Sequence, residues 1–319
     1  MLASLTVRLI ACLSLFAASL SGLDAWRMQL EAHRERRNAT LRSDPFSPLA
    51  LVHREYLDGR TRLTIGSGEK ADLRLTGEGL APLHASLEVI GAVATARAET
   101  SDKLTKLGDD NLTAGPASEI DLTASPRFRI GGYNFLFRTD APVRGAAIEV
   151  YDSKAPSLAA FQGLDYFALN ERFVVQAQVR PRNAPPQVQL IDSAGNPRPY
   201  WIYGDLRFSI EGQPVTMEVY AATMDRDAIK RSGFMLIFAD ATSGKESYYA
   251  GRYLDIEGKL NGDVNVDFNY ARNPPCSFSP VYTCPFPRAE NRLPVAIPVG
   301  EKAFTGQTAT PAPSECNRN

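Results

Sequence analysis

The chain has 319 residues, enough for two ordinary domains or for one large β unit. Its hydrophobic share of 44% and charged share of 22% exclude both a disordered chain and a multispan membrane protein. The 35 Lys and Arg residues nearly balance the 36 Asp and Glu residues, so we expect no nucleic-acid partner, which would need a basic surface. With three histidines and four cysteines there is little material for a transition-metal enzyme, and we expect no metal and no cofactor.

The first 23 residues have the pattern of an export signal. Arg8 is the single charge before Asp24, and residues 9–20 form an apolar run that is too short to span a membrane comfortably. Small residues follow this run, as at a cleavage site. We therefore predict a signal peptide at residues 1–23 and an extracytoplasmic location, periplasmic or secreted, with no stable membrane span after cleavage. The alternative is an N-terminal anchor that is not cleaved.

Residues 24–43 are rich in charge, and neither glycine nor proline interrupts them. Leu23, Trp26 and Leu30 lie at helical spacing. This pattern predicts one short amphipathic helix ahead of the rest of the chain.

From Asp44 onward, glycine and proline punctuate the chain about every 8–12 residues, with short runs rich in Val, Ile, Phe and Tyr between them. This rhythm predicts an all-β fold: a β-sandwich or barrel-like second domain preceded by a smaller β-sandwich. We place the N-terminal β domain at residues 44–140 and the C-terminal β domain at residues 150–305. The polar residues 306–319 are expected to form a disordered tail.

The expected strands are runs of β-branched and aromatic residues. In the first domain they are residues 62–65, 72–75, 85–90, 128–130 and 133–137. In the second domain they are residues 173–179, 187–190, 205–210, 215–221, 234–239, 248–254 and 263–270. The last strand alternates with period two, so one of its faces carries carboxylates and amides and the other carries Val, Phe and Tyr.

Polar residues with a capacity for chemistry gather in this last strand and in the loops around it. The candidate ligand-binding residues are Arg252, Asn269, Asn273, Asn291 and Arg292. The candidate catalytic residues are Asp267 and Glu290, either of which would serve as the acid or base of a hydrolase while Arg252, Asn269 and Arg292 orient the substrate. Two other interpretations stay open: a buried Arg–Asp network with a structural role, and a Ca²⁺ ion at Asp267.

The segment SGKESYY, residues 243–249, contains a serine and a lysine close together. A Ser–Lys nucleophile is rejected because no second Lys or His base follows at a helical offset. We expect a turn that leads into a tyrosine-rich strand.

Cys276 and Cys284 lie eight residues apart in a proline-rich loop. In an oxidising compartment this spacing predicts a local disulfide, which would stabilise the fold by about 2–3 kcal/mol. A zinc pair lacks further Cys or His ligands nearby in the sequence. The role of Cys316, in the polar tail, stays open.

Six short motifs near the end of the chain resemble a known family. They are GRYL at 251–254, DFN at 267–269, NPPC at 273–276, CPFP at 284–287, NRLP at 291–294 and GEK at 300–302. Together they resemble the bacterial domain-of-unknown-function family 1684. The resemblance spans nearly the whole mature chain, is most specific over residues 234–304 and is looser before residue 150. It implies a predominantly β fold and no established activity.

Residues 62–90 show a weaker resemblance to forkhead-associated domains. Gly66 and His84 match the turn glycine and the histidine of that fold. Ser67 and Ala81 stand where arginine and serine hold phosphothreonine in those domains, so the gripping guanidinium and hydroxyl are missing. The resemblance implies a fold without phosphothreonine binding, and His84 is expected to be structural.

These observations favour an exported, non-catalytic β protein of the cell envelope that binds an unidentified small molecule or envelope protein. The sequence contains no phosphate-binding Gly-Lys-Ser loop, no HExxH and no GxSxG motif. The alternative is the hydrolase described above, which requires its residues to converge on one cleft.

Overall fold

The computed structural model describes residues 22–77, 79–108, 115–124, 126–141, 145–225, 229, 233–256 and 261–306. Nearly all of the expected signal peptide, the tail from residue 307 and Cys316 lie outside these residues. The chain divides into two compact units, Met1–Asn38 and Ala39–Asn319. Both groups of strands described below belong to the second unit.

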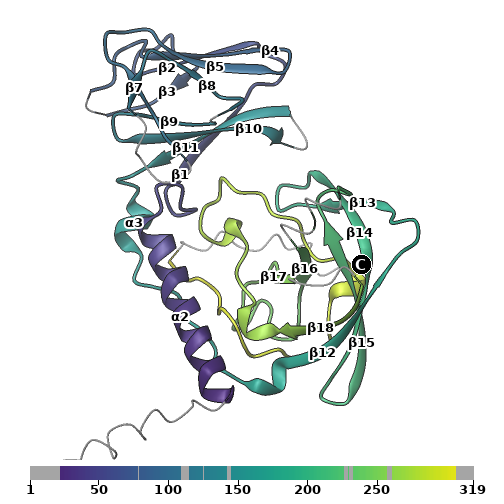
Figure 1. Cartoon of the computed structure of the whole chain (residues 1–319). Helices are drawn as coiled ribbons and strands as arrows, with labels where there is room; N and C mark the ends of the chain where they lie inside the picture. The colour runs from purple at the N-terminus through teal and green to yellow at the C-terminus, as the bar shows by residue number, and fades with distance from the viewer. Residues whose placement is uncertain are drawn as a thin grey trace, which may run out of the picture. The chain divides into compact units, whose positions relative to one another are not determined.

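The predicted N-terminal helix is present as α2 (Gly22–Ser43) (Figure 1). Near its end, the Ser43 hydroxyl donates a hydrogen bond to the carbonyl of Ala39 at 2.8 Å. Arg42 lies in the last turn, where a cation interacts favourably with the helix dipole. None of the helices in the described part of the chain has the length and apolar character needed to cross a membrane.

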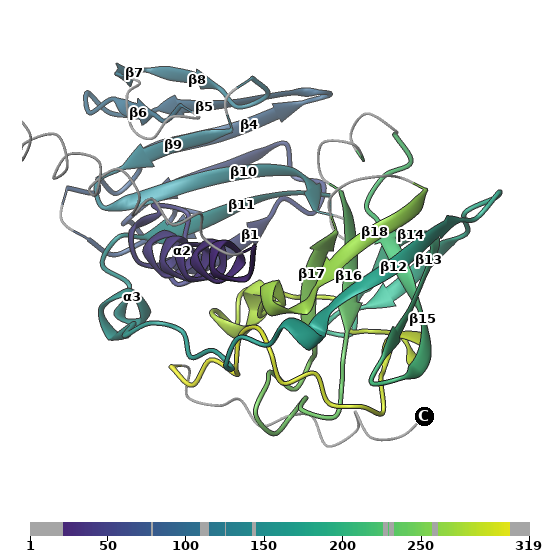
Figure 2. The same ribbon diagram turned by 60° about the horizontal axis from the view of Figure 1, so that its bottom comes forward.

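Two sheets form the first group of strands, and Figure 2 shows them as stacked layers. The strands are β1 (Leu51–Tyr56), β2 (Arg62–Gly66), β3 (Leu73–Arg74), β4 (Ala85–Ile90), β5 (Val93–Ala98), β6 (Leu104–Lys106), β7 (Pro116–Ala117), β8 (Glu119–Asp121), β9 (Arg127–Ile130), β10 (Tyr133–Ala141) and β11 (Gly145–Asp152). One sheet has the order β1-β11-β10-β9-β6-β7 and the other β3-β2-β4-β5-β8. Buried side chains of both sheets share one core, in which Phe128 and Phe135 stack with ring centroids 4.8 Å apart.

Strand β11 pairs antiparallel with both β1 and β10. The first group of strands therefore continues to Asp152, past the expected domain end at residue 140. The sequence GAAIEVYD alternates so that Ile148 and Val150 face the core. Pairing with two strands, not composition, fixes the place of this segment.

A single curled sheet dominates the second group of strands (Figure 1). Its strands are β12 (Val174–Pro181), β13 (Gln187–Ile191), β14 (Pro197–Ile210), β15 (Gln213–Ala221), β16 (Phe234–Phe238), β17 (Arg252–Ile256) and β18 (Gly262–Asp267). The order is β17-β16-β15-β14-β12-β18, with β13 paired to β14. Short helices complete it: α3 (Pro156–Ala160), η1 (Glu171–Phe173), η2 (Phe268–Tyr270), η3 (Pro275–Ser277) and η4 (Ala289–Asn291).

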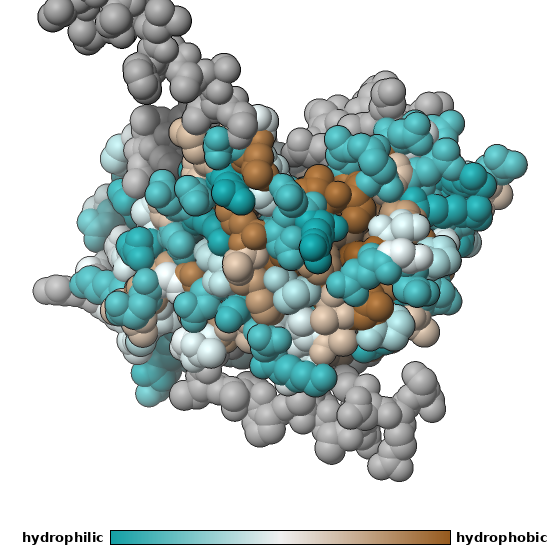
Figure 3. Space-filling view, turned by 90° about the horizontal axis from the view of Figure 1, so that it is seen from below, coloured by the Kyte–Doolittle hydropathy of each residue, from teal (hydrophilic) through white to brown (hydrophobic). Residues whose placement is uncertain are grey.

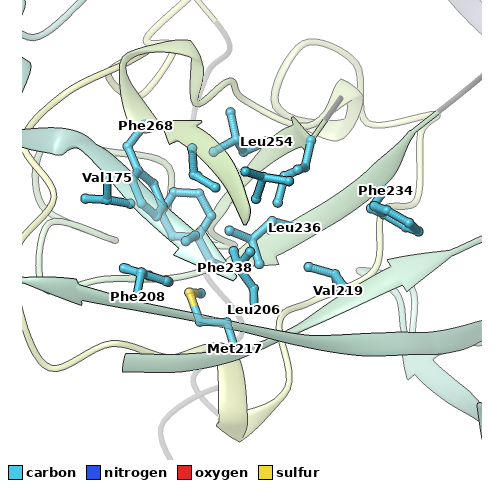
Figure 4. Packing of buried hydrophobic residues seen from close by; sticks show 14 of the residues in the cluster. Val175, Leu206, Phe208, Met217, Val219, Phe234, Leu236, Phe238, Leu254 and Phe268 are labelled. Atoms are coloured by element: carbon cyan, nitrogen blue, oxygen red, sulfur yellow. The ribbon is translucent and has the colours of Figure 1, made fainter. Parts of the chain in front are cut away.

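The end strands of this sheet contribute to the same core as its central strands. Leu254 of β17 and Val266 of β18 belong to one buried cluster with Leu206 and Met217. Figure 4 shows Leu206, Met217 and Leu254 in this cluster, together with Phe208, Phe238 and Phe268, whose rings contact one another. The curled sheet confirms the expected all-β class.

Several expected strands differ in their bounds from the observed ones, and two of the differences have a clear local cause. The segment predicted as a strand at residues 248–254 begins only at Arg252, because Gly251 adopts a positive φ of 87°, and a Cβ at this position would clash with the carbonyl of Phe238. Strand β18 stops at Asp267, whose side chain accepts a hydrogen bond from the amide of Asn269 and caps a 3₁₀ turn. Both differences come from capping and glycine geometry, which override the β propensity of tyrosine and phenylalanine.

The face of the molecule in Figure 3 is mostly hydrophilic, with smaller groups of apolar residues between the polar ones. Large exposed hydrophobic residues are spread over several elements of the second unit: Val52, Leu83, Ile90, Val93, Val174 and Ile191. Scattered residues of this kind are normal on a protein surface. The exposed hydrophobic residues therefore do not mark a binding surface.

Candidate functional site

Arg252 is completely buried and forms an ion pair with Asp240 rather than with Asp267. Its Nη2 donates to Asp240 Oδ2 at 2.5 Å and to the carbonyl of Ile297 at 2.8 Å, and its Nη1 donates to the carbonyl of Val299. Burial lowers the pKa of the Arg252 guanidinium, while the Asp240 carboxylate acts in the opposite direction. Arg252 thus connects β17 with the turn after β16 and with the C-terminal segment.

The motif asparagines are buried, and their side chains bind backbone groups. Asn291 accepts from the amide of Glu218 at 2.8 Å and donates to the carbonyls of Glu218 and Ile237, each at 2.9 Å. Asn269 accepts from the amide of Asn170 and donates to the carbonyl of Asn170, both at 3.0 Å. These amides complete the hydrogen bonding of neighbouring segments where regular pairing ends.

The two candidate carboxylates have different hydrogen-bond partners. Asp267 is half-buried, and its Oδ1 accepts from the amide and the side-chain nitrogen of Asn269 at 2.9 and 2.7 Å. Glu290 is exposed and accepts from Arg288 at 3.1 Å, and Arg292 is exposed as well. None of the seven predicted site residues is among the lining residues of the three cavities for which the structure gives a lining, of about 440, 500 and 270 Å³.

Cys276 and Cys284 are both buried and are free thiols in this structure. The two lie close together, since the amide of Cys276 donates to the sulfur of Cys284 at 3.2 Å. The hydrogen bond between the thiols holds the pKa of Cys276 below its ordinary value and raises the pKa of Cys284. Each cysteine lines a different cavity.

The cavity beside Cys276 has a volume of about 440 Å³, which suits a small-molecule ligand. We call it the tyrosine pocket. Its lining comes from the turn at residues 244–249, the loop at residues 276–282, the segment at residues 303–305 and Ser193. These segments are far apart in sequence and meet only in the folded chain.

The Arg252–Asp240 pair supports the turn that lines this pocket. Asp240 Oδ1 accepts from the amide and the hydroxyl of Thr242 at 2.7 and 2.6 Å. The Thr242 hydroxyl in turn bonds to the hydroxyl of Ser247, a lining residue, at 2.8 Å. Gly244 has a φ of 79°, which lets the chain reverse direction at this point.

Asn273 supports the C-terminal segment that forms another wall. Its amide donates to Glu301 Oε2 and its side chain donates to the carbonyl of Lys302, both at 2.7 Å. One residue further on, the amide of Ala303 donates to the carbonyl of Glu246 at 2.9 Å. The NPPC and GEK motifs therefore hold together two walls of the tyrosine pocket.

Aromatic rings form much of the pocket wall. Tyr248 and Tyr249 lie with ring centroids 4.8 Å apart, and Phe304 packs against Phe278 at 5.1 Å. The hydroxyl of Tyr248 donates to the carbonyl of Cys276 at 3.4 Å, and burial raises the pKa of Tyr248 well above its ordinary value. Such rings offer a flat ligand large contact areas.

Two polar groups in the pocket have no partner among the described residues. The hydroxyl of Ser277 is inaccessible to solvent, with the residue only 2% exposed, and makes no hydrogen bond there. Lys245 is exposed, and its ammonium group makes no ion pair with the described residues. No carboxylate lines the pocket. The pocket can thus accommodate an apolar ring together with a negatively charged or hydrogen-bonding group.

The sequence pattern does not predict this pocket. It predicts a turn that leads into a tyrosine-rich strand, whereas the pocket depends on contacts between segments that periodicity cannot reveal. The described residues contain no group of three or more His, Cys, Asp or Glu side chains able to hold a metal ion.

In the forkhead-associated-like segment, the loop that would hold phosphothreonine is closed by internal hydrogen bonds. Ser67 Oγ donates to the carbonyl of Leu80 at 2.9 Å, and the Ser67 amide donates to the carbonyl of Ala81 at 3.0 Å. His84 is buried, and its Nδ1 accepts from the amide of Ala81 at 3.3 Å. His84 therefore stabilises the loop.

The fold and the pocket define an all-β protein with a ligand-sized cavity in its second group of strands. Residues 159–302 match the family DUF1684, described as a protein of unknown function. The match confirms the resemblance seen in the six motifs, and the looser resemblance before residue 150 lies outside it.

Solved structures show further similarities. The solution structure of an uncharacterised protein of Haloarcula marismortui is 27% identical, with 45% of this chain and 78% of that chain covered and a TM-score of 0.39. The FHA domain of FhaA, solved in complex with the intracellular domain of Rv3910, is 17% identical over 30% of this chain and 96% of that chain, with a TM-score of 0.18. A chain from a study of phosphothreonine-dependent FHA domain interactions is 18% identical over 31% and 92%, also with a TM-score of 0.18. The comparison with curated proteins gave no match.

Proposed function

We propose that this protein is an exported, non-catalytic ligand-binding protein of the cell envelope, and that its ligand is a small aromatic carboxylate held in the tyrosine pocket. The observation that carries the proposal is the buried, unpartnered hydroxyl of Ser277 in a cavity walled by aromatic rings. A buried hydroxyl without a partner costs about 1–3 kcal/mol, so a ligand that bonds to it gains that amount in return.

The charge of the pocket supports an anionic ligand. Lys245 is the lining residue with a permanent charge, and no lining carboxylate opposes it. Tyr248, Tyr249 and Phe304 supply apolar and edge contacts for a ring. Arg252, Asn273 and Asn291 then act as scaffold residues.

Neither Asp267 nor Glu290, the candidate catalytic residues of the hydrolase alternative, lines the tyrosine pocket. The export signal predicted at residues 1–23 supports the envelope location. A disulfide between Cys276 and Cys284 fits the same location and would fix the loop that carries Ser277.

Calorimetric titration with benzoate, 4-hydroxyphenylacetate and indole-3-acetate, each paired with its neutral amide, tests the proposal. We expect at least one carboxylate to bind more tightly than its amide. Replacing Lys245 by Ala should weaken that binding about fivefold, since an exposed charge contributes about 1 kcal/mol. Replacing Ser277 by Ala should weaken binding without changing the preference for the carboxylate.

Lys70→Ala is the matched control, because Lys70 is an exposed lysine in the first group of strands. It should bind like the parent protein. The proposal fails if no carboxylate binds with a Kd below about 1 mM, or if Lys245→Ala and Lys70→Ala have equal affinities.

A further inference from the structure

Ser247 contributes a buried hydroxyl group to the tyrosine pocket, and the surrounding hydrogen bonds fix the direction in which it donates. The residue lines the pocket and is only 1% exposed. Its Oγ lies 2.8 Å from Oγ1 of Thr242, and by distance alone either oxygen could be the donor. A hydroxyl has one proton to give and two lone pairs that accept, so the direction of this bond decides what Ser247 offers to a ligand.

Asp240 settles the direction of this bond. Its carboxylate forms an ion pair with Arg252 and therefore only accepts hydrogen bonds. Asp240 Oδ1 lies 2.6 Å from Thr242 Oγ1, so the single proton of the Thr242 hydroxyl goes to Asp240. The proton between Thr242 and Ser247 must then come from Ser247. We call Asp240, Thr242 and Ser247 the hydroxyl chain, since each hydroxyl donates to the next residue towards Asp240.

The hydroxyl chain makes Ser247 an acceptor for a ligand. Its proton is given to Thr242, and within the described part of the chain no group donates to its Oγ. A buried acceptor costs free energy when it is left without a donor. A ligand group with an O–H or N–H bond therefore fits beside Ser247, whereas a group with lone pairs alone would be repelled by those of the Ser247 oxygen.

Other polar groups of the pocket have donors to offer. Ser193 Oγ accepts from the amide of Cys284 at 3.3 Å, which leaves the Ser193 proton for a ligand. The ammonium group of Lys245 can only donate. These groups suit a carboxylate and Ser247 does not. The pocket therefore provides partners for both a carboxylate and a separate donor on the same ligand.

The place of Ser247 in the chain indicates which part of the ligand carries the donor. Ser247 immediately precedes Tyr248 and Tyr249, whose rings form part of the pocket wall. The acceptor is thus next to the side chains that contact an aromatic ring. Phenol O–H and indole N–H are donors attached to such a ring, and a phenol with a pKa of about 10 keeps its proton at neutral pH.

We infer, on the basis of the proposed function, that the ligand of the tyrosine pocket is an aromatic carboxylate whose ring carries a hydrogen-bond donor, and that Ser247 Oγ accepts from this donor. The donor is a phenol hydroxyl or an indole N–H. Asp240 and Thr242 are positioning residues, because they act on the ligand through the proton of Ser247.

Calorimetric titration of the full chain with two sets of matched carboxylates tests the inference. The first set is 4-hydroxyphenylacetate, phenylacetate and 4-methoxyphenylacetate, and the second is indole-3-acetate and 1-methylindole-3-acetate. The negative charge is the same throughout each set, and only the first member has the ring donor. In at least one set we expect the first member to bind about tenfold more tightly than the others.

Two variants locate the acceptor that causes this preference. Ser247→Ala removes the acceptor and should reduce the preference to less than about twofold. Thr242→Val keeps the shape of the side chain but releases the proton of Ser247, so the preference for hydroxyl over methoxy should fall to a similar extent. A purely structural loss would weaken all ligands alike and leave the preference unchanged. Ser209→Ala, an exposed serine on β14, is the control and should bind as the parent does.

Equal affinities within both sets would overturn the inference and leave the proposed function intact. If no carboxylate binds with a Kd below about 1 mM, both are overturned. A tenfold preference that persists in Ser247→Ala would also overturn the inference. The comparison of ligands uses the parent protein alone, so it remains decisive if a variant loses the native near-ultraviolet circular dichroism spectrum.

Discussion

Arg252 and Asp240 form an ion pair in which both side chains are 0% exposed. Removing one partner from a buried pair leaves an uncompensated charge and costs about 3–5 kcal/mol. We therefore expect Asp240→Ala to lower the free energy of unfolding by about this amount, measured by urea denaturation. The turn that carries Lys245 should also lose order, and carboxylate binding should weaken with it.

Asp255→Ala is the matched control for that variant. Asp255 accepts from Arg272 in an ion pair whose side chains are 51% and 29% exposed. Such a pair contributes at most about 1 kcal/mol. Equal losses from Asp240→Ala and Asp255→Ala would contradict a structural role for the buried pair.

Asn291 satisfies three backbone groups with one side chain. Asn291→Asp keeps the shape but cannot donate to the carbonyls of Glu218 and Ile237, so we expect a loss of about 2–5 kcal/mol in the free energy of unfolding. The exposed Asn265, which accepts from Gln176, provides the comparison. Asn265→Asp should change stability by no more than about 0.5 kcal/mol. If Asn291→Asp lowers the free energy of unfolding only slightly, water replaces the hydrogen bonds of the Asn291 side chain.

His84 gives stability a dependence on pH. Burial lowers the pKa of His84 from its ordinary value of 6.5, while the Asp102 carboxylate opposes the shift. Below about pH 6.5 the unfolded chain binds more protons at this histidine than the folded chain does. Stability is therefore complete above pH 6.5 and is lost as the pH falls towards the lowered pKa of the folded state.

Urea midpoints at several pH values between about 7.5 and 5 measure this effect. His84→Gln should flatten the curve in this range. Asp72, Asp121 and Asp192 also have lowered pKa values, but their ordinary value is 3.8, so their losses occur at lower pH. If the urea midpoint of His84→Gln depends on pH as steeply as that of the parent, another group causes the pH dependence.

The thiols of Cys276 and Cys284 are expected to form a disulfide when the protein is purified from an oxidising compartment. The bridge should raise the free energy of unfolding by about 2–3 kcal/mol, and dithiothreitol should reverse the gain. Peptide mapping by mass spectrometry identifies the bridge. The double variant with serine at both positions should be insensitive to dithiothreitol. Two unmodified thiols after such a purification would rule the bridge out.

Local sequence patterns predicted much of the fold. The strand expected at residues 85–90 is observed as β4 at the same bounds, because its hydrophobic run ends at turns on both sides. Strand β5, with the sequence VATARA, is not predicted by the sequence pattern, since its alanines have weak β propensity. Pairing with β4 and β8 makes this segment a strand.

The candidate site was less predictable. The alternation at residues 263–270 correctly gave a strand, yet the polarity of Asp267 and Asn269 reflects a capped turn. Arg252 and Asn291 are fully buried, yet in sequence they resemble ligand-binding residues. The residue type alone does not distinguish a polar side chain that binds backbone groups from one that binds a ligand. The tyrosine pocket depends on Tyr248, Cys276 and Phe304 meeting in space, and no sequence period encodes this.

Tyr282 lines both the tyrosine pocket and a second cavity of about 270 Å³. Its hydroxyl lies 3.1 Å from that of Tyr151, and the guanidinium of Arg54 lies 5.3 Å from the centre of its ring. An occupant that displaces this shared wall changes the shape of both sites at once. Ligands in the two cavities would then be coupled, and by thermodynamic reciprocity each would alter the affinity for the other by the same factor.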